Sequence, residues 1–210
     1  KRLNLEYYKN NILHFFVPIC FVATSMVKHA DDMISLTKIM SDYKFLKWLL
    51  WNEFIFDERR DDVDEVQDVL DYLHKKMLIV TAERDGEVWI ETKSRGHARL
   101  KPFAGLIHNY LESCWIVMRS MVYLKKKPLT QKEWLAKIRP LGDRIFRKGE
   151  ILRAESLSNA NYVNAIKFLE DAELVVSQTE GKSGKEERVY RLTDNRAQME
   201  VLRRRLFKFL

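Results

Sequence analysis

An internal repeat constrains the fold of this chain more than any other feature of its sequence. Shifted by 96 residues, the segment 69–80 (VLDYLHKKMLIV) aligns with the segment 165–176 (AIKFLEDAELVV). The strongly apolar positions up to the helix end agree, and so do the strand residues that follow. In each copy we expect a helix before this segment and a hairpin after it. Helix, helix and hairpin follow one another in this order in a winged helix, so the repeat predicts two such units. The alternative is chance, because any amphipathic helix that leads into a strand gives this pattern.

The predicted fold class is mainly α, with two winged-helix-like units that each end in a small β-hairpin. The sequence has only seven glycines and four prolines among 210 residues. Because these residues interrupt regular structure, their scarcity predicts long helices and few loops. The first helix should run from residue 3 to 27, interrupted by Pro18. Its apolar run, 15–23, is shorter than the roughly 20 residues that span a bilayer. We therefore expect it to be buried against other helices rather than to dip into a membrane interface.

The first unit should contain two further helices and a hairpin. Ser35 begins one helix, and the acidic stretch 61–65 suits the positive N-terminal end of the next. A hairpin over 77–91 turns at Asp85-Gly86, which is a strong hairpin signal between apolar runs. A long helix over 97–124 follows.

The second unit should start at residue 128. Thr130 and Glu133 form a capping box for a helix that ends near Phe146. Ser158 should cap a helix that continues to Ala172, and a hairpin over 173–192 turns at 181–184. Asp194 should cap a final amphipathic helix that ends at Leu210.

The net charge of +7 favours an anionic partner, either nucleic acid or an acidic lipid surface. The basic residues are clustered at Lys125-Lys126-Lys127 and Arg203-Arg204-Arg205. The alternative is that these cations only keep helix faces solvated. Cys20 and Cys114 have no CxxC spacing and no histidine cluster nearby, which argues against a metal site or disulfide and for buried thiols in a reducing compartment.

Charge placement argues against DNA binding by the first unit. Its candidate recognition helix displays a run of carboxylates, which repel a polyanion: Asp61, Asp62, Asp64, Glu65, Asp68 and Asp71. The second candidate helix offers Asn159, Asn161 and Asn164, with Lys167 as its cation. The wing residues Lys182, Lys185 and Arg188 suit DNA, so DNA binding by the second unit stays open.

The sequence offers no catalytic, cofactor-binding or metal-ligating constellation. Its five histidines are scattered, and no Ser/His/Asp order stands out. We interpret His29-Ala30-Asp31-Asp32 as a polar helix end rather than a metal or acid/base site. The 181–184 segment (GKSG) lacks the earlier glycine of a phosphate-binding loop.

Several segments resemble one family. The segment 7–14 (YYKNNILH), followed by an apolar helix, resembles the segment just after the acyltransferase domain in membrane glycerol-3-phosphate acyltransferases. Further similar segments are 45–47, 52–54, 149–151, 155–158 and 164–166. The resemblance implies transfer of a fatty acyl group from acyl-CoA or acyl carrier protein to the 1-hydroxyl of glycerol 3-phosphate, the first step of phospholipid synthesis.

The catalytic motif of that family is missing from this sequence. Family members use His-x-x-x-x-Asp, in which the histidine deprotonates the hydroxyl and the aspartate orients it. The residues five positions after the histidines are Ile19, Ile34, Ile79, Pro102 and Ser113. The Pro-Glu-Gly substrate motif is absent too. We therefore interpret the chain as a region that follows the catalytic domain, and the start at Lys1 without a methionine fits a fragment.

These inferences define a first hypothesis. Residues 1–34 form a linking helix after a missing catalytic domain, 35–127 a first winged-helix-like unit plus the long helix, and 128–210 a second unit. The chain would support or regulate the acyltransferase catalytic domain and contact an anionic membrane from the cytoplasm, as a peripheral protein without a cofactor.

The expected lipid contacts are Lys125, Lys126, Lys127, Arg203, Arg204 and Arg205. Here the last helix would lie on the membrane; alternatively its residues Leu202, Leu206 and Phe207 pack into the core. Two other hypotheses stay open: a tandem winged-helix DNA-binding or scaffold protein, and an independent soluble enzyme.

Overall fold

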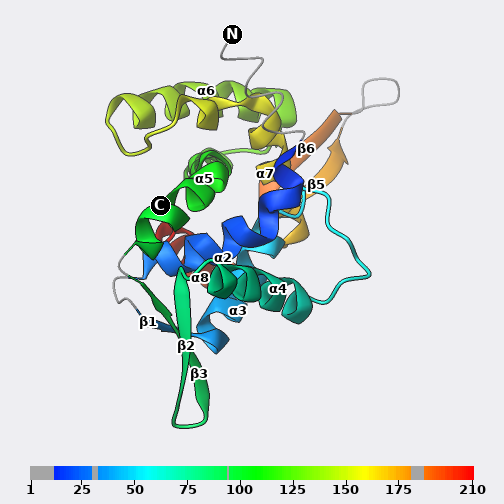
Figure 1. Ribbon diagram of the computed structural model, residues 1–210. Coiled ribbons are helices and arrows are strands. Elements are labelled where there is room, and N and C mark those ends of the chain that lie inside the picture. Colours follow the sequence, from blue (N-terminus) through cyan, green and yellow to red (C-terminus); the bar gives the residue numbers. More distant parts are fainter. Residues whose placement is uncertain (1–11, 30–32, 94, 181–186) are drawn as a thin grey trace. The chain divides into compact units, whose positions relative to one another are not determined.

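A computed structural model describes residues 12–29, 33–93, 95–180 and 187–210 (Figure 1). The chain is mainly helical, with two small three-stranded antiparallel sheets. It forms two compact units, residues 1–107 and 108–210. The domain limits expected from the sequence, after residues 34 and 127, mark where the repeated segments begin. They stay a prediction.

Unit 1 consists of three helices, a small sheet and the first turns of a long helix. Its elements are a 3-10 turn η1 (His14–Phe16), α2 (Val17–Lys28), β1 (Met33–Ser35), α3 (Leu36–Leu49), α4 (Asp62–Lys75), β2 (Ile79–Arg84), β3 (Glu87–Thr92) and α5 (Gly96–Ser120). The sheet has the order β1-β3-β2. Figure 1 shows the β2–β3 hairpin as a twisted ribbon that extends beyond helices α2, α3 and α4.

The starts of α3 and α4 in unit 1 follow from capping side chains. Ser35 precedes α3 and accepts a hydrogen bond from the Lys38 amide at 3.2 Å. Asp61 precedes α4 and accepts one from the Val63 amide at 3.0 Å. Such caps satisfy amides that have no partner inside the helix. The apolar face of α4 is buried and consists of Val66, Val69, Leu70 and Leu73.

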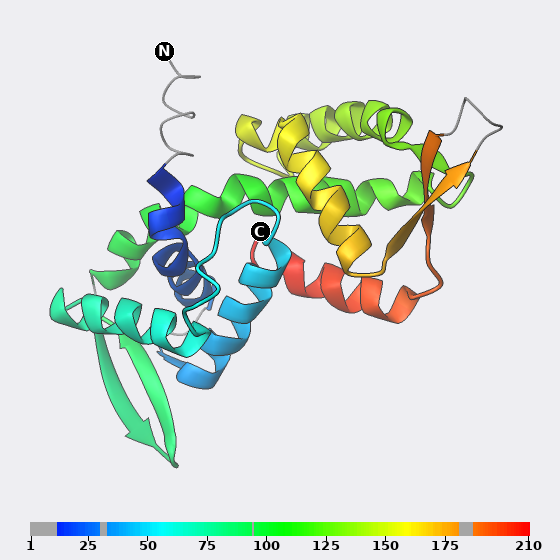
Figure 2. The same ribbon diagram turned by 90° about the vertical axis from the view of Figure 1, so that its right-hand side faces the viewer.

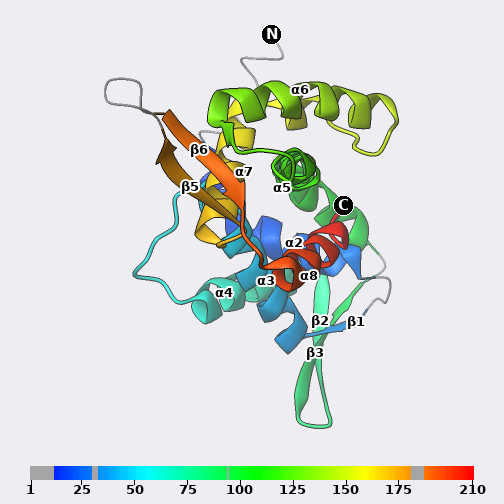
Figure 3. The ribbon, with the colours of Figure 1, turned by 180° about the vertical axis from the view of Figure 1, so that it is seen from behind.

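Unit 2 contains the rest of α5, a 3-10 turn η2 (Met121–Tyr123) and a second sheet with its helices. These elements are β4 (Leu129–Thr130), α6 (Gln131–Arg147), a 3-10 turn η3 (Ala154–Leu157), α7 (Asn159–Asp171), β5 (Val175–Glu180), β6 (Glu187–Leu192) and α8 (Arg196–Phe207). The predicted capping box of Thr130 and Glu133 is present at the start of α6. The core includes Trp134, whose indole N–H donates to Ser120 Oγ at 2.8 Å. Figures 2 and 3 show α8, in red, as a separate helix after the β5–β6 hairpin.

The two units share the same order of elements. Each runs strand, helix, helix, strand, strand, and the second sheet has the order β4-β6-β5, which corresponds to β1-β3-β2. Met77 after α4 and Glu173 after α7 both adopt a positive φ of 55°, and they lie 96 residues apart. In both places the next amide, of Leu78 or Leu174, bonds the carbonyl five residues back. A residue in this left-handed (αL) conformation at a helix end is usually glycine. The two units therefore share an unusual backbone conformation at equivalent positions.

Four expectations about local structure need correction. Asn195, not Asp194, caps α8, because its side chain accepts from the Gln198 amide. Ser158 precedes α7, but its side chain makes no capping bond. Each predicted two-stranded hairpin gains a third strand, β1 or β4, too short to show a pattern in the sequence. Phe15 and Phe16 are exposed, although Val17 and residues 20–26 of the same run are buried.

Three parts of the sequence-based description lie outside the described residues. These are residues 3–11, with the start of the predicted first helix and most of the motif at 7–14, residues 30–32, and the turn 181–186, which holds Lys182 and Lys185 of the predicted wing. Within the described part of the chain, no helix is both long enough and apolar enough to cross a membrane.

Candidate functional site

The histidines and cysteines of the described residues do not assemble into a reactive centre. No group of three or more His, Cys, Asp or Glu side chains there could hold a metal ion. His29, in the segment considered for acid/base chemistry, lies 3.2 Å from Asp42 of α3; residues 30–32 of that segment are not described. The thiols of Cys20 and Cys114 are buried, as predicted. Burial raises the pKa of the Cys20 thiol to about 12, so this thiol stays protonated and unreactive at neutral pH.

The first predicted basic cluster, Lys125–Lys127, and Arg203 of the second line one surface groove of unit 2. We call it the basic groove; its volume is about 840 Å³. Its walls come from the segment after η2, from the end of β6 with the following linker, and from α8. Six cations line it, against two carboxylates: Lys125, Lys126, Lys127, Arg191, Arg196 and Arg203, with Asp194 and Glu200. Arg191 and Arg196 were missed from the sequence, because neither belongs to a run of basic residues.

Most of the negative charge near the groove is already paired. Glu200 accepts from Arg204 at 3.0 Å and lies 3.9 Å from Arg203. Lys127 lies 3.5 Å from Glu133, and Arg191 pairs with Glu180. The remaining cations, Lys125, Lys126 and Arg196, are exposed and have no ion-pair partner among the described residues. The groove therefore carries an excess of positive charge that is accessible to an anion.

Helix geometry separates the three arginines at 203–205. The groove face of α8 carries residues 196, 199, 200 and 203, which recur at the spacing of one helix face. Arg203 lies in the groove, Arg204 lies outside its lining beside Glu200, and Arg205 is half-buried.

The other face of α8 is buried in unit 2. Leu202 and Leu206 are 3% and 0% exposed, so the apolar face that they form is not free to lie on a membrane. Phe207 is more than half exposed, and its ring lies 5.4 Å from that of Trp115. The alternative in which residues of the last helix pack into the core is therefore correct for Leu202 and Leu206. Contact of this unit with a lipid surface would depend on the cations rather than on insertion of α8.

The loop between α6 and α7, which holds the segments 149–151 and 155–158 of the family resemblance, is bound by Glu112 of α5 in a buried cluster. The Glu112 carboxylate accepts hydrogen bonds from the amides of Leu152, at 2.7 Å, and Arg153, at 3.1 Å, and from the Ser156 hydroxyl. His108 Nδ1 lies 3.3 Å away. Burial alone would raise the pKa of Glu112, but the bonds from His108, Leu152 and Ser156 outweigh it, and the pKa lies below its ordinary value. This cluster fixes the loop between α6 and α7 and leaves no open site.

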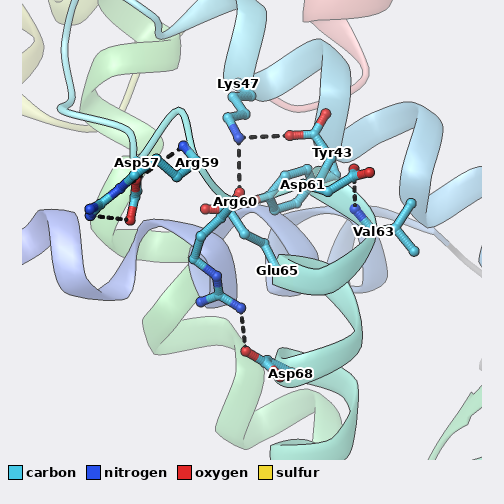
Figure 4. A network of polar contacts seen from close by, with 10 residues as sticks. Tyr43, Lys47, Asp57, Arg59, Arg60, Asp61, Val63, Glu65 and Asp68 are labelled. Atoms are coloured by element: carbon cyan, nitrogen blue, oxygen red, sulfur yellow. Dashed lines mark hydrogen bonds and ion pairs between the residues drawn. The ribbon is translucent and has the colours of Figure 1, made fainter.

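A second buried polar cluster joins α3 to α4 in unit 1 (Figure 4). The Tyr43 hydroxyl donates to Glu65 at 2.6 Å, and Lys47 Nζ donates to Glu65 at 2.9 Å and to Asp62 at 2.6 Å. Burial and the bond to Glu65 raise the pKa of Tyr43 far above its ordinary value. Burial would lower the pKa of Lys47, but its bonds to Asp62 and Glu65 dominate and raise it. Both groups stay protonated, so the cluster is suited to holding two helices together.

Exposed aromatic side chains surround an apolar pocket in unit 1. The pocket has a volume of about 360 Å³, and its apolar walls come from the start of α2, from α4 and from α5: Phe15, Phe16, Pro18, Ile19, Val69, Tyr72 and Phe103. Arg60, Glu65 and Asp68 complete the lining, and Arg60 pairs with Asp68 at 2.5 Å. Phe15 is 81% exposed. Large exposed apolar groups gathered around a pocket are typical of an interaction surface.

Comparison with protein families decides which family the chain belongs to. The profile of the glycerol-3-phosphate acyltransferase C-terminal region matches residues 1–178. The chain belongs to this family. A comparison with curated proteins gave no match.

The acyltransferase C-terminal region, as matched, covers only part of the basic groove. Lys125, Lys126 and Lys127 lie within the matched residues, whereas β6 and α8, with Arg191, Arg196 and Arg203, lie beyond residue 178. The resemblance inferred from the segments 7–14, 45–47, 52–54, 149–151, 155–158 and 164–166 is thereby confirmed at the level of the family.

Proposed function

We propose that this chain is a non-catalytic region of a glycerol-3-phosphate acyltransferase that supports or regulates the catalytic domain at the membrane. The observation that carries this proposal is the family match over residues 1–178 in a sequence that lacks His-x-x-x-x-Asp. The acyl transfer itself, from acyl-CoA or acyl carrier protein to glycerol 3-phosphate, would belong to the catalytic domain. The cytoplasmic, peripheral location is part of the same proposal.

The chain alone should show no acyltransferase turnover. No histidine in the sequence is followed by aspartate five positions later, so the base that deprotonates the glycerol 3-phosphate hydroxyl is missing. The purified chain would be incubated with acyl-CoA and glycerol 3-phosphate, and product would be measured against a buffer blank. An acyltransferase domain of the family serves as the positive control. Product formation above the blank, lost on heating the chain, would contradict the proposal.

The apolar pocket of unit 1 is our candidate for the surface that contacts the catalytic domain. Phe15 follows directly after the segment 7–14, which resembles the segment just after the acyltransferase domain in the family. A contact there would bury phenyl groups that are now in water. Burying a side chain of this size stabilises a complex by about 1.5–3 kcal/mol, before the costs of association.

Replacing Phe15 with serine should weaken association with the acyltransferase domain at least tenfold. The partner is the acyltransferase domain encoded by the same organism, and affinity would be measured by titration calorimetry. Ile55→Ser is the matched control, because Ile55 is 82% exposed and does not line the pocket. Equal affinity for the unchanged chain and both variants would show that the pocket is not the contact.

A tandem winged-helix protein is the second candidate, favoured by the shared order of elements in the two units. We propose that the two units are a duplicated winged-helix-like fold. DNA binding gains little support from their charges, since α4 exposes Asp64, Asp68 and Asp71, and the exposed cation of α7 is Lys167. Nucleic acid attracts proteins chiefly through neutralised phosphates, and these helices offer few cations for that.

A further inference from the structure

The lining of the basic groove combines charge with apolar surface. Beside its six cations, the groove contains Leu124, Pro128, Leu192 and Met199. The residues come from two segments that are distant in the sequence, 124–128 and 191–203, and the fold of unit 2 brings them together. A patch that only kept the protein soluble would need no such apolar component.

The N-terminal end of α8 adds to the positive potential of this groove. Arg196, the first residue of α8, lines it, and the first turn of this 12-residue helix contains no acidic residue. The amide groups at a helix N-terminus carry a partial positive charge, which attracts phosphate groups. Two of these amides in α8 are already bonded, that of Arg196 to the Asp194 carbonyl and that of Gln198 to the Asn195 side chain, so they contribute charge rather than free donors. Arg196 also presents a planar guanidinium, which can donate two hydrogen bonds to one phosphate.

We propose that the basic groove binds the phosphomonoester headgroup of a membrane lipid. A phosphomonoester carries a charge of about −1.5 to −2 at neutral pH and three acceptor oxygens, so it can accept hydrogen bonds from several cations at once. The glycerol and the first acyl carbons would lie against Leu124, Leu192 and Met199. A free phosphate ion would use the cations but leave this apolar surface uncovered.

This assignment rests on the proposed function, because only a chain held at a membrane meets such lipids at high surface density. It goes beyond that function by naming the ligand and its site. Three of the six cations of the groove, Arg191, Arg196 and Arg203, lie outside the residues that match the family. The site therefore depends on residues of this chain and not on the matched region alone.

The test is vesicle binding by the full chain and by two variants of equal charge. The groove variant is Lys126→Gln with Arg196→Gln, since neither residue has an ion-pair partner among the described residues. The control variant is Lys132→Gln with Arg144→Gln, exposed cations of α6 that do not line the groove. Vesicles of phosphatidylcholine would contain either phosphatidate or phosphatidylserine, at matched surface charge. Thermal unfolding of each variant checks that the fold is kept.

We expect tighter binding to phosphatidate than to phosphatidylserine vesicles, and a loss of about twentyfold in the groove variant, since each Lys or Arg contributes about 1 kcal/mol at such a surface. The control variant should lose much less on phosphatidate vesicles. Equal losses in both variants, or no preference for phosphatidate, would show plain charge attraction and overturn the proposal.

Two further measurements distinguish other ligands. Release from the vesicles by inorganic phosphate, but not by chloride at the same ionic strength, would assign the groove to a soluble phosphate instead. Duplex DNA that binds tightly and loses affinity in the groove variant would assign it to nucleic acid. Failure of the groove experiment would leave the contact with the acyltransferase domain untouched, because that contact is measured through Phe15 in the other unit.

Discussion

Replacing Glu112 with alanine should lower the free energy of unfolding of the unit formed by residues 108–210 by about 3–5 kcal/mol, which is typical of removing one partner from a buried charged cluster. The Glu112 carboxylate is almost fully buried and accepts from two backbone amides and a hydroxyl. Without it, the Leu152 and Arg153 amides lose their acceptor, and each unsatisfied buried donor costs about 1–3 kcal/mol. Urea unfolding followed by tryptophan fluorescence would measure the loss, since Trp115 and Trp134 lie in this unit.

Glu150→Ala is the matched control for this experiment. Glu150 lies in the same loop and pairs with Arg119, but both side chains are more than a third exposed. An exposed ion pair contributes about 0–1 kcal/mol, so this variant should unfold almost as the unchanged chain does. If Glu112→Ala were equally mild, the hydrogen bonds of the Glu112 cluster would not stabilise the loop, and our explanation of the family segment would be wrong.

The acid side of the stability curve offers an independent check on Glu112. Its pKa is lowered in the folded state, so its stabilisation is fully present above the pKa of the unfolded chain. That stabilisation is lost as the pH falls through the folded-state pKa. Glu112→Gln should therefore reduce the dependence of stability on pH in the acid range.

The sequence predicts the helices of this fold well because their signals are local. The caps Ser35 and Thr130 and the turn at Asp85-Gly86 each depend on a few neighbouring residues, and the structure confirms all three. Strands β1 and β4 pair instead with β3 and β6, more than 50 residues away in each case. With two or three residues each, they show no periodic pattern, so only the tertiary structure reveals the third strand of each sheet.

The candidate site was predicted only in part, for a similar reason. Runs of like charge identified Lys125–Lys127 and Arg203–Arg205, but a helix turns each of three successive side chains to a different direction. Only Arg203 of its run lines the groove, while the single residues Arg191 and Arg196 join it from β6 and α8. Single cations such as Arg191 and Arg196 leave no trace in local sequence patterns, so only the tertiary structure adds them to the run at Lys125–Lys127.

The segments that reveal the family in unit 2 do so through folding rather than chemistry. Ser156 and the amide of Leu152 bond Glu112, and Gly149 adopts a φ of +71° where α6 ends. That conformation favours glycine because it has no Cβ. In this region, the residues that resemble the family determine the structure of one loop. Such a structural role agrees with the proposal that the chain supports a catalytic domain.

Alkaline pH should destabilise the unit formed by residues 1–107 through Tyr43. The pKa of Tyr43 is raised in the folded state, so above about pH 10 the unfolded chain releases a proton that the folded chain keeps. The stabilisation is thus present below the unfolded pKa and is lost as the pH rises, by about 1.4 kcal/mol per pH unit for one proton. Lys47, whose pKa is also raised, acts in the same direction.

Replacing Tyr43 with phenylalanine should remove most of this alkaline loss, because the buried phenol that must ionise on unfolding is gone. Urea unfolding at about pH 8 and about pH 11 would compare the variant with the unchanged chain, as these values lie on either side of the ordinary tyrosine pKa. Tyr72→Phe is the control, since Tyr72 of α4 is 46% exposed and lies outside the buried cluster. Glu65→Ala should cost about 3 kcal/mol already at neutral pH, because it leaves Tyr43 and Lys47 without their shared acceptor. If Tyr43→Phe and Tyr72→Phe lost stability equally between the two pH values, the Tyr43–Glu65 bond would not control the alkaline response of this unit.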